Sequence, residues 1–339
     1  MEKITVLSGG VGGARFVQGL LAHLAGAYPS DAGQESTVDV TVIANTGDDM
    51  WLNGLRVCPD LDTLMYTLGG GIDESQGWGR TDDSRRTAGE IAAYGRGWDW
   101  FTLGDLDLGT HIVRSELLRE GSTLSEATKF LCQRWQPGVN LLPMSDEPVE
   151  THVRLTEAND AHRAGDLIHF EEWWVRYRAG IPAAGFVQVG LESATAAPGV
   201  VDAILDADVV LVPPSNPVVS VGTILAVPGI REALGNTSAP VVGISPIIGG
   251  SAVRGMADQC LAALGIPSTA VDVGRHYGAR ARDGLLDGWL VDVADEAALP
   301  ALADAGLKAA AVPLWMTDVP ATAAIASEAL ALAGEPVRT

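Results

Sequence analysis

Short apolar runs, each followed by a turn rich in glycine or proline and then by a helical pattern, recur toward both ends of this chain. The first run, residues 4–7, precedes the loop SGGVGG and a stretch in which apolar residues repeat at helical spacing from Phe16 to Leu24. Further units of this kind lie at 38–45, 207–217, 239–250, 288–293 and 309–318. Strands that alternate with helices need crossover connections and therefore pair in parallel. The pattern predicts an α/β fold with a Rossmann-like, doubly wound, mostly parallel sheet.

This rhythm fades in the middle of the sequence. Six of the nine tryptophans lie between residues 78 and 174. A chain of 339 residues is long enough for one large α/β core with an inserted region. We therefore interpret residues 76–184 as a Trp-rich insertion that caps the sheet, and residues 1–75 and 185–339 as the Rossmann-like core.

The composition excludes several classes of partner. The chain has 43 acidic and 22 basic residues, a formal net charge of −21, and so acidic a surface repels nucleic acid. Three cysteines without CxxC spacing indicate neither a disulfide scaffold nor a zinc site. Because no apolar run has the length of a membrane span and no signal peptide is visible, we expect a cytoplasmic protein that does not contact a membrane.

The loop after the first predicted strand contains Gly9, Gly10, Gly12 and Gly13. Glycines between a strand and a helix let an anionic group approach the N–H groups of the helix N-terminus, so this loop is a candidate phosphate-binding site. A tight turn without a ligand is the alternative. The dinucleotide fingerprint fails, because Arg15 stands at its third glycine position and the second strand ends in Asn45 rather than an acidic residue. A nicotinamide dehydrogenase is therefore disfavoured.

Two further loops follow predicted strands and should lie at the same edge of the sheet. The loop PPSNP contains Ser215, Asn216 and Pro217, and the loop SPIIGG contains Ser245. A loop stiffened by proline loses little entropy when it binds a ligand, although an ordinary helix cap is the alternative. Since α/β proteins bind ligands at the carboxyl ends of their strands, we predict that these residues bind a nucleotide together with the glycine loop.

Aspartates occur in pairs near these loops: Asp48 with Asp49, Asp60 with Asp62, and Asp105 with Asp107. Carboxylates without nearby cysteine or histidine favour a hard cation, Mg²⁺ or Ca²⁺, that also binds phosphate oxygens. Such a cation would offset the repulsion between the like charges. Capping and turn formation are the alternative for each aspartate, and we favour them for Asp49 and Asp60. For His111 a hydrogen-bonded helix histidine is the favoured interpretation.

Several longer motifs together resemble one known family. They are GGVGGARF (9–16), NTGDD (45–49), RVCPDLDT (56–63), MYTLGGGID (65–73), THIVR (110–114), RWQPG (134–138), EEWWVRYRA (171–179), PSNPVVSVG (214–222), SPIIGG (245–250) and GRHYGAR (274–280). On these motifs the chain resembles the CofD/FbiA family of coenzyme F420 biosynthesis over nearly its whole length. Its tryptophan-containing blocks are similar to the actinobacterial branch.

The resemblance implies a transferase that moves a phosphoenolpyruvyl or 2-phospho-L-lactyl group. The donor would be a guanosine diphosphate conjugate and the acceptor the ribityl hydroxyl of the deazaflavin Fo, with release of GMP and formation of (dehydro-)coenzyme F420-0. The implied cofactor is Mg²⁺, with Asp48 and Asp62 as its ligands and as the catalytic residues. The implied Fo-binding residues are Asp62, Thr63, Thr102 and Asp105, in a pocket to which the insertion contributes. A homodimer is expected from the class of protein.

Two features leave alternatives open. Family members are expected to read LGDRD where this chain reads LGDLD, so Leu106 stands in place of an arginine and a contact with phosphate or Fo would be lost. The second alternative concerns function: a non-catalytic, nucleotide-sugar-binding regulator of the gluconeogenesis-factor type would share the glycine-rich start and the sheet. The PDLDT block and the Trp-rich insertion argue against that regulator.

Overall fold

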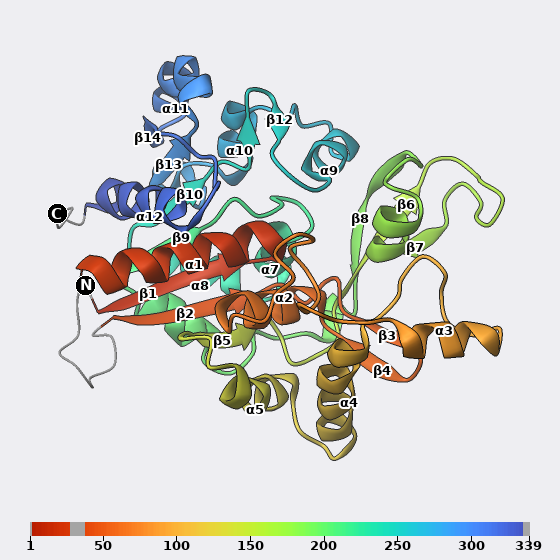
Figure 1. Ribbon diagram of the computed structural model, residues 1–339. Helices are drawn as coiled ribbons and strands as arrows, with labels where there is room; N and C mark the ends of the chain where they lie inside the picture. Colours follow the sequence, from red (N-terminus) through yellow and green to blue (C-terminus); the bar gives the residue numbers. More distant parts are fainter. Residues whose placement is uncertain (1, 28–37, 335–339) are drawn as a thin grey trace.

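A seven-stranded sheet forms the centre of the computed structural model, which describes residues 2–27 and 38–334 (Figure 1). Its strands are β1 (Lys3–Ser8), β2 (Asp39–Ala44), β5 (Asn140–Pro143), β9 (Val209–Val212), β10 (Val241–Ile244), β13 (Gly288–Val291) and β14 (Lys308–Ala311). Neighbouring strands in this sheet all run parallel. The predicted α/β, Rossmann-like architecture is confirmed.

The order of the strands creates one reversal in the sheet. Across the sheet the order is β14-β13-β10-β9-β1-β2-β5. The chain starts at β1, moves outward through β2 to β5, returns to β9 on the other side of β1, and then moves outward to β14. Ile4 of β1 lies between Val40 of β2 and Val209 of β9 in the register. The chain thus continues from β1 toward one edge of the sheet and from β9 toward the other. The carboxyl ends of these two strands therefore form a topological switch point, where open α/β sheets bind ligands.

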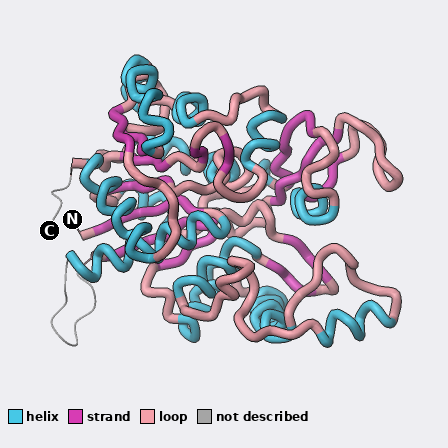
Figure 2. The backbone as a smooth tube through the Cα atoms, turned by 45° about the horizontal axis from the view of Figure 1, so that its top comes forward, coloured by secondary structure: helices cyan, strands magenta, loops and turns pink. Residues whose placement is uncertain are grey.

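Helices cover both faces of the sheet, as the ribbon and the tube views show (Figure 1, Figure 2). The helices of the described residues are α1 (Gly10–Ala27), α2 (Pro59–Leu68), α3 (Arg86–Ala93), α4 (Asp105–Arg119), α5 (Leu124–Trp135), α6 (Val200–Leu205), α7 (Val221–Ala226), α8 (Ile230–Asn236), α9 (Ala257–Ala263), α10 (Ala270–Tyr277), α11 (Leu299–Asp304) and α12 (Val319–Ala333), of which α3 and α4 lie away from the central sheet. In the part of the chain that the structure describes, none of the helices combines the length and apolar character needed to cross a membrane.

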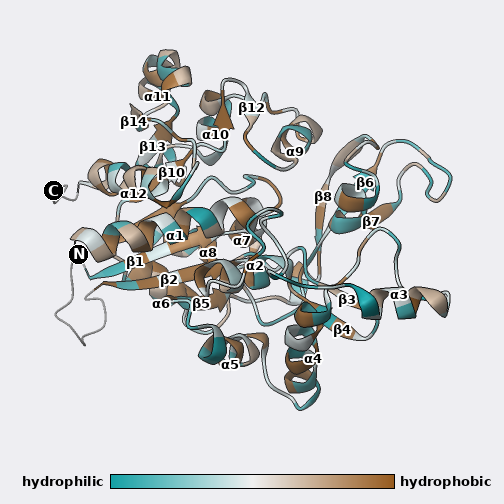
Figure 3. Cartoon of the chain, viewed as in Figure 1, coloured by the Kyte–Doolittle hydropathy of each residue, from teal (hydrophilic) through white to brown (hydrophobic). Residues whose placement is uncertain are grey.

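Successive strand residues point to opposite faces and so divide the core in two. Val42 and Leu211 belong to the apolar cluster that includes α1, α2 and α12. Their neighbours Ile43 and Val210 belong to the cluster that includes α6, α7 and α8. Figure 3 shows hydrophobic segments, coloured brown, in the central strands and on helices that flank them. This burial on both faces explains why the strands read as apolar runs rather than as alternating sequences.

The other strands form three small antiparallel sheets beside the central one. They are β3 (Met50–Leu52) with β4 (Leu55–Val57), β6 (Glu150–Leu155) with β7 (Leu167–His169) and β8 (Ala183–Val189), and β11 (Ile247–Ile248) with β12 (Ser251–Ala252). Strand β5 lies inside the predicted insertion, residues 76–184, yet pairs with β2 at the edge of the central sheet. Its sequence NLLP gives no strand signal, because it is short and ends in proline, which is not typical of a strand. Proline is tolerated here because β5 is an edge strand. The domain boundaries themselves stay a prediction.

Helix α1 packs against α12 through a glycine. A Cβ atom added at Gly19 would lie 2.7 Å from the backbone carbonyl carbon of Thr322. Gly19→Ala should therefore lower the free energy of unfolding by about 1–3 kcal/mol, because the two helices must move apart. Gly26 lies on the same helix with open space around it, so Gly26→Ala should raise the free energy of unfolding by about 0.5–1 kcal/mol. Urea unfolding measures both variants, and effects of the same sign would contradict this account.

Candidate active site

The loops that follow β1 and β9 are joined at the switch point. The N–H of Gly9 donates to Oγ of Ser215 (3.2 Å), and this hydroxyl donates to the carbonyl oxygen of Gly9 (2.8 Å). Nearby, Oγ of Ser8 is buried and has no partner among the described residues. The predicted meeting of the glycine loop with the PPSNP loop is therefore present, and it lies where α/β sheets bind ligands.

Close packing explains why glycines occupy this loop. Gly10 has a φ of +57°, a conformation that favours glycine. A Cβ atom at Gly12 would lie 2.8 Å from the carbonyl oxygen of Pro214, and one at Gly13 would lie 2.8 Å from Oγ of Ser215. Gly10, Gly12 and Gly13, predicted as part of a loop, form the first turn of α1, and this turn lies directly against the loop after β9 with no room for side chains between them.

Three buried carboxylates, Asp48, Asp60 and Glu171, gather near the glycine loop, and we call them the glycine-loop carboxylates. The N–H of Gly10 and Nδ2 of Asn45 (2.9 Å) both donate to Asp60 at the start of α2. The same Nδ2 lies 3.5 Å from Oδ2 of Asp48, whose Oδ1 is buried without a partner in the described part of the chain. No lysine, arginine or histidine among the described residues forms an ion pair with any of the three.

Burial and mutual repulsion raise the pKa values of the glycine-loop carboxylates. Burial, followed by the charges of Asp60, Glu171 and Asp49, holds the pKa of Asp48 well above its ordinary value. Burial raises the pKa of Asp60 to about 6 in spite of the hydrogen bonds that it accepts. Burial and the charge of Asp60 raise the pKa of Glu171 to about 8. A divalent cation would relieve this repulsion, and an all-oxygen donor set fits a hard cation.

Asp49 belongs to a different ion pair. Nη2 of Arg56 lies 3.5 Å from Oδ2 of Asp49, and Nη1 lies 3.4 Å from Oε1 of Glu150 on β6. Burial raises the pKa of Asp49 to about 7, although the charge of Arg56 acts to lower it. Arg56 on β4 thus joins Asp49, in the turn before β3, to Glu150 of the β6–β7–β8 sheet.

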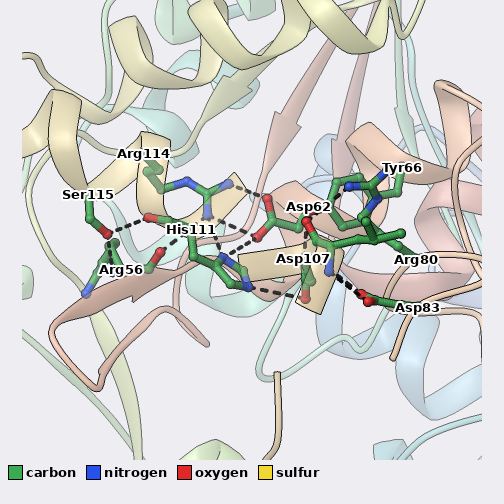
Figure 4. Close-up of polar contacts among 10 residues, drawn as sticks. Arg56, Asp62, Tyr66, Arg80, Asp83, Asp107, His111, Arg114 and Ser115 are labelled. Atoms are coloured by element: carbon green, nitrogen blue, oxygen red, sulfur yellow. Dashed lines mark hydrogen bonds and ion pairs between the residues drawn. The ribbon is translucent and has the colours of Figure 1, made fainter. Parts of the chain in front are cut away.

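Asp62 lies in a separate buried network between α2 and α4 (Figure 4). Nη1 of Arg114 donates to Oδ2 of Asp62 (3.0 Å), and Nη2 donates to Oδ1. Asp107, His111 and Arg114 share one face of α4, because residues three or four positions apart are neighbours on a helix. Nε2 of His111 lies 3.2 Å from Oδ2 of Asp107, and the hydroxyl of Tyr66 donates to Oδ1 of Asp107 (2.6 Å). The helix histidine predicted at position 111 is present.

Asp62, Asp107 and His111 each offer an atom within 4.8 Å of the others, a spacing that could hold a metal ion. Both carboxylates already have strong partners, however. Arg114 binds both oxygens of Asp62, and the contacts with His111 and Tyr66 hold the pKa of Asp107 below its ordinary value although burial acts to raise it. The glycine-loop carboxylates lack such compensation, so they fit a cation better than this group does.

A cavity of about 290 Å³ lies next to this network. Its lining includes Trp78, Arg80, Asp83, Arg85, Thr102 and Asp107. Because Asp107 belongs both to the cavity wall and to the network of Asp62, the cavity is linked to Asp62 through His111.

Asp83 and Asp105 accept hydrogen bonds that fasten the start of α3 to the start of α4. The hydroxyl of Ser84 (2.5 Å) and the backbone N–H groups of Arg86 (3.1 Å) and Thr87 (2.9 Å) donate to Asp105. The Ser84 hydroxyl and these backbone bonds lower the pKa of Asp105 to about 2. Asp83 in turn accepts hydrogen bonds from two backbone N–H groups in the first turn of α4 (2.7 and 3.1 Å). Asp105 thus satisfies backbone donors at the start of α3, and Asp83 satisfies backbone donors at the start of α4.

Known proteins with similar sequences place the chain in a family. The family model described as 2-phospho-L-lactate transferase CofD matches residues 4–317. The chain belongs to the CofD family.

Relatives in this family cover almost the whole chain. The chain is 58% identical over 333 residues to the phosphoenolpyruvate transferase of Streptomyces griseus subsp. griseus, and 57% identical over 332 residues to that of Mycolicibacterium smegmatis. Each of these alignments covers 98% of this chain and 99% of the relative. The phosphoenolpyruvate transferase of Streptomyces coelicolor is 56% identical, with 98% of both chains covered. This CofD-family chain is therefore a transferase.

A solved structure shares the fold. A member of the UPF0052 family from Bacillus halodurans superposes with a TM-score of 0.62 at 16% sequence identity, covering 97% of this chain and 98% of that one. At this identity the similarity concerns the fold alone.

The structure of this CofD-family chain brings only some of the predicted site residues together. Asp48 lies with Asp60 and Glu171, whereas both oxygens of Asp62 are bound by Arg114 in the other network. A metal ion shared by Asp48 and Asp62 stays a prediction, and the contacts favour Asp60 as the companion of Asp48. The sequence predicts only a capping or turn-forming role for Asp60. In the structure its carboxylate also accepts a hydrogen bond from the N–H of Gly10.

The other predicted nucleotide-binding side chains are used within their own loops. Oδ1 of Asn216 accepts the N–H groups of Val218 (2.9 Å) and Val219 (3.2 Å). Oγ of Ser245 donates to the carbonyl oxygen of Ile247 (2.9 Å), and Pro217 is buried between strand and helix. These residues shape the edge of the sheet, and their contact with a nucleotide stays a prediction.

The predicted Fo-binding residues are divided between several places. Thr102 lines the cavity, Thr63 is buried in α2, and Asp105 caps α3. The side chain of Leu106 is exposed, while its carbonyl oxygen accepts a hydrogen bond from Arg80 (3.1 Å).

Sequence reasoning missed Glu171 and Arg114. Both stand in motifs that carry the family resemblance, EEWWVRYRA and THIVR, but neither motif indicates which carboxylate or guanidinium is buried. The signal that could have found Arg114 is its spacing of three residues from His111 and seven from Asp107, which places all three on one helix face.

Removing the guanidinium of Arg114 should leave Asp62 buried with only His111, whose Nδ1 lies 3.6 Å from Oδ2, beside it. Arg114→Leu is expected to lower the free energy of unfolding by about 3–5 kcal/mol. The double variant Asp62→Leu, Arg114→Leu should regain much of this loss, because no lone charge remains. Urea unfolding of the single and double variants tests the pair, and additive losses would contradict the predicted coupling.

The pKa of Glu171 predicts how stability depends on pH in metal-free protein. The pKa lies near 4.5 in the unfolded chain and is about 8 in the folded protein. Between these pH values the unfolded state loses the proton while the folded state keeps it, so the free energy of unfolding falls as the pH rises. Glu171→Gln should reduce this fall by more than about 1 kcal/mol between about pH 5 and about pH 8.5.

Urea unfolding at the two pH values with a chelator present measures this difference. Glu90→Gln, which changes an exposed carboxylate on α3, is the control and should follow the wild type. If Glu171→Gln and wild type show the same pH dependence, the Glu171 carboxyl does not cause the fall in the free energy of unfolding.

Proposed function

We propose that this chain transfers a phosphoenolpyruvyl group from a guanosine diphosphate conjugate to the terminal ribityl hydroxyl of the deazaflavin Fo. The products would be GMP and dehydro-coenzyme F420-0. The observation that carries this proposal is the 58% identity, over 98% of the chain, to a phosphoenolpyruvate transferase. The glycine-loop carboxylates at the switch point support it, because a diphosphate and its cation need such a site. A 2-phospho-L-lactyl donor is the alternative, since the two groups differ by few atoms.

We assign the metal to the glycine-loop carboxylates, with Mg²⁺ as the ion. Asp48 would hold it together with Asp60 and Glu171, whose repulsion and raised pKa values indicate that a positive charge is lacking there. When bound, Mg²⁺ would neutralise negative charge on the phosphate oxygens of the donor. The pairing of Asp48 with Asp62 is less well supported, because Arg114 already compensates Asp62.

The donor's diphosphate would lie beside the glycine loop, next to these carboxylates. Backbone N–H groups at the start of α1 and the unpartnered hydroxyl of Ser8 are available donors beside Ser215. Loops after three parallel strands, which contain Gly9, Ser215 and Ser245, would enclose the nucleotide.

The chemical step needs a base for the attacking hydroxyl. The ribityl oxygen forms a bond to the phosphorus that bears the three-carbon acid, and the bond from this phosphorus to the GMP oxygen breaks. We assign the hydroxyl proton to Oδ1 of Asp48, which is buried and has no partner among the described residues.

Fo would bind in the cavity lined by Trp78, Thr102 and Asp107. These residues belong to the range 76–184, which supports the expectation that this part of the chain supplies the acceptor pocket. Asp62 would then act through Arg114, His111 and Asp107, by fixing the inner wall of the cavity, rather than as the base.

A non-catalytic nucleotide-sugar-binding regulator is not favoured. The case for such a regulator rests on the shared sheet and the glycine-rich start of the chain. A solved structure at 16% identity supports the fold but not this function. Such a regulator would bind nucleotide without consuming it.

Product analysis with the purified protein tests the proposed reaction. With Mg²⁺, Fo and each of the lactyl, enolpyruvyl and glyceryl donors in turn, mass spectrometry should detect a deazaflavin phosphodiester and GMP. Asp48→Asn should lower the rate by about 10²–10⁴-fold while GMP still binds, because the base is lost. Asp206→Asn, an exposed residue paired with Lys3, is the control and should keep the wild-type rate.

Two results would contradict the proposal. If no donor gives a deazaflavin phosphodiester, the chain is not this transferase, and nucleotide binding without turnover would indicate the regulator. If Asp48→Asn turns over at the wild-type rate, Asp48 is not the base.

A further inference from the structure

Arg80 forms part of the cavity wall and is held there by protein contacts (Figure 4). Its Nη1 donates to the carbonyl oxygen of Leu106 (3.1 Å). Its guanidinium carbon lies 4.9 Å from the ring centre of Trp135 and 5.9 Å from that of Tyr66. Contacts with two aromatic rings and one carbonyl fix the plane of the guanidinium. Its Nε is shielded from solvent and has no hydrogen-bond partner in the described part of the chain.

The carboxylates that line the same cavity do not satisfy Arg80. No ion pair among the described residues joins Arg80 to Asp73, Asp83 or Asp107. Each of these carboxylates has other partners: Asp73 accepts hydrogen bonds from its own turn, Asp83 caps α4, and Asp107 is bonded to Tyr66. The carboxylates of the cavity wall are therefore already hydrogen-bonded, whereas the guanidinium of Arg80 has more N–H donors than its hydrogen bond to Leu106 uses.

Trp78 adds a flat surface to this cavity. Its side chain is 48% exposed, although an indole gains free energy from burial. Arg85 lies above the ring, 5.9 Å from its centre. An exposed indole beside free N–H donors suits a planar aromatic ligand that carries oxygen atoms on its edge.

We propose that Arg80 is a binding residue that selects the acceptor, by donating hydrogen bonds to oxygen atoms on the edge of a planar ring whose face contacts Trp78. This inference rests on the proposed function, in which the acceptor is the deazaflavin Fo, a planar ring with carbonyl oxygens on its edge. The guanidinium is already oriented before the ligand arrives, so little entropy is lost when the bonds form. Arg80 then determines affinity for the acceptor and has no part in binding the donor.

Fluorescence titration of Fo against wild type and Arg80→Gln tests this role. The dissociation constant for Fo should rise by about 10- to 100-fold in Arg80→Gln, as for loss of a hydrogen bond from a charged donor. In steady-state kinetics the KM for Fo should rise, while the KM for the donor stays at the wild-type value. Arg80→Lys, which keeps the charge but loses the planar fork, should show an intermediate effect.

Arg134→Gln is the matched control. Arg134 lies over the same indole of Trp135 (5.2 Å to the ring centre) but is exposed. If Arg80 acted only by packing on Trp135, Arg134→Gln would weaken Fo binding as well. The inference requires wild-type affinity in this control.

The outcomes separate this inference from the proposed function. If wild type binds Fo and Arg80→Gln binds it equally well, or if the KM of the donor rises with that of Fo, the role of Arg80 is overturned and the function stands. If the wild-type protein does not bind Fo, the proposed function and this role are both overturned. Should Arg80→Gln fail to fold, Arg80→Lys decides the question in the same titration.

Discussion

The carboxylate of Asp60 joins the loops on which the rest of the site depends. It accepts a hydrogen bond from Gly10 at the start of α1 and another from Asn45 after β2, so the loops of two neighbouring strands meet on one side chain from α2. Asn45 in turn approaches Asp48 and accepts the N–H of Gly47, which fixes the turn that carries the aspartates. A buried carboxylate can hold this position only because several donors converge on it.

The site contains two groups of buried carboxylates, and they differ in how their charge is compensated. Asp62 is bound on both oxygens by Arg114, so its charge is neutralised within the protein. Asp48 and Glu171 have no such partner among the described residues, and burial raises both of their pKa values. An uncompensated buried cluster is costly to stability and is therefore typical of a site that receives a cation or a proton. The compensated group is suited to positioning, because its geometry does not depend on a ligand.

The fold was largely predictable because each central strand is buried on both faces and therefore reads as an apolar run. Strand β5 escaped prediction, since an edge strand that ends in Pro143 has no such signal. At the site, Asp48 and Ser215 were predictable from their places after β2 and β9. Glu171 was not, because it joins the other carboxylates from the helical turn after β7, outside the central sheet, and such an approach leaves no trace in local spacing.

The sequence by itself determined the parallel α/β sheet, the positions of the loops at its carboxyl edge, and the family, since these depend on local periodicity and on motifs that lie along the chain. Only the tertiary structure decided which carboxylates face one another and which arginine neutralises which aspartate. Asp60 and Asp62 are two residues apart on α2, yet one faces Gly10 and the other faces Arg114. The physical reason is that charge compensation depends on distances between side chains from different elements, and those distances are set by how the helices pack on the sheet.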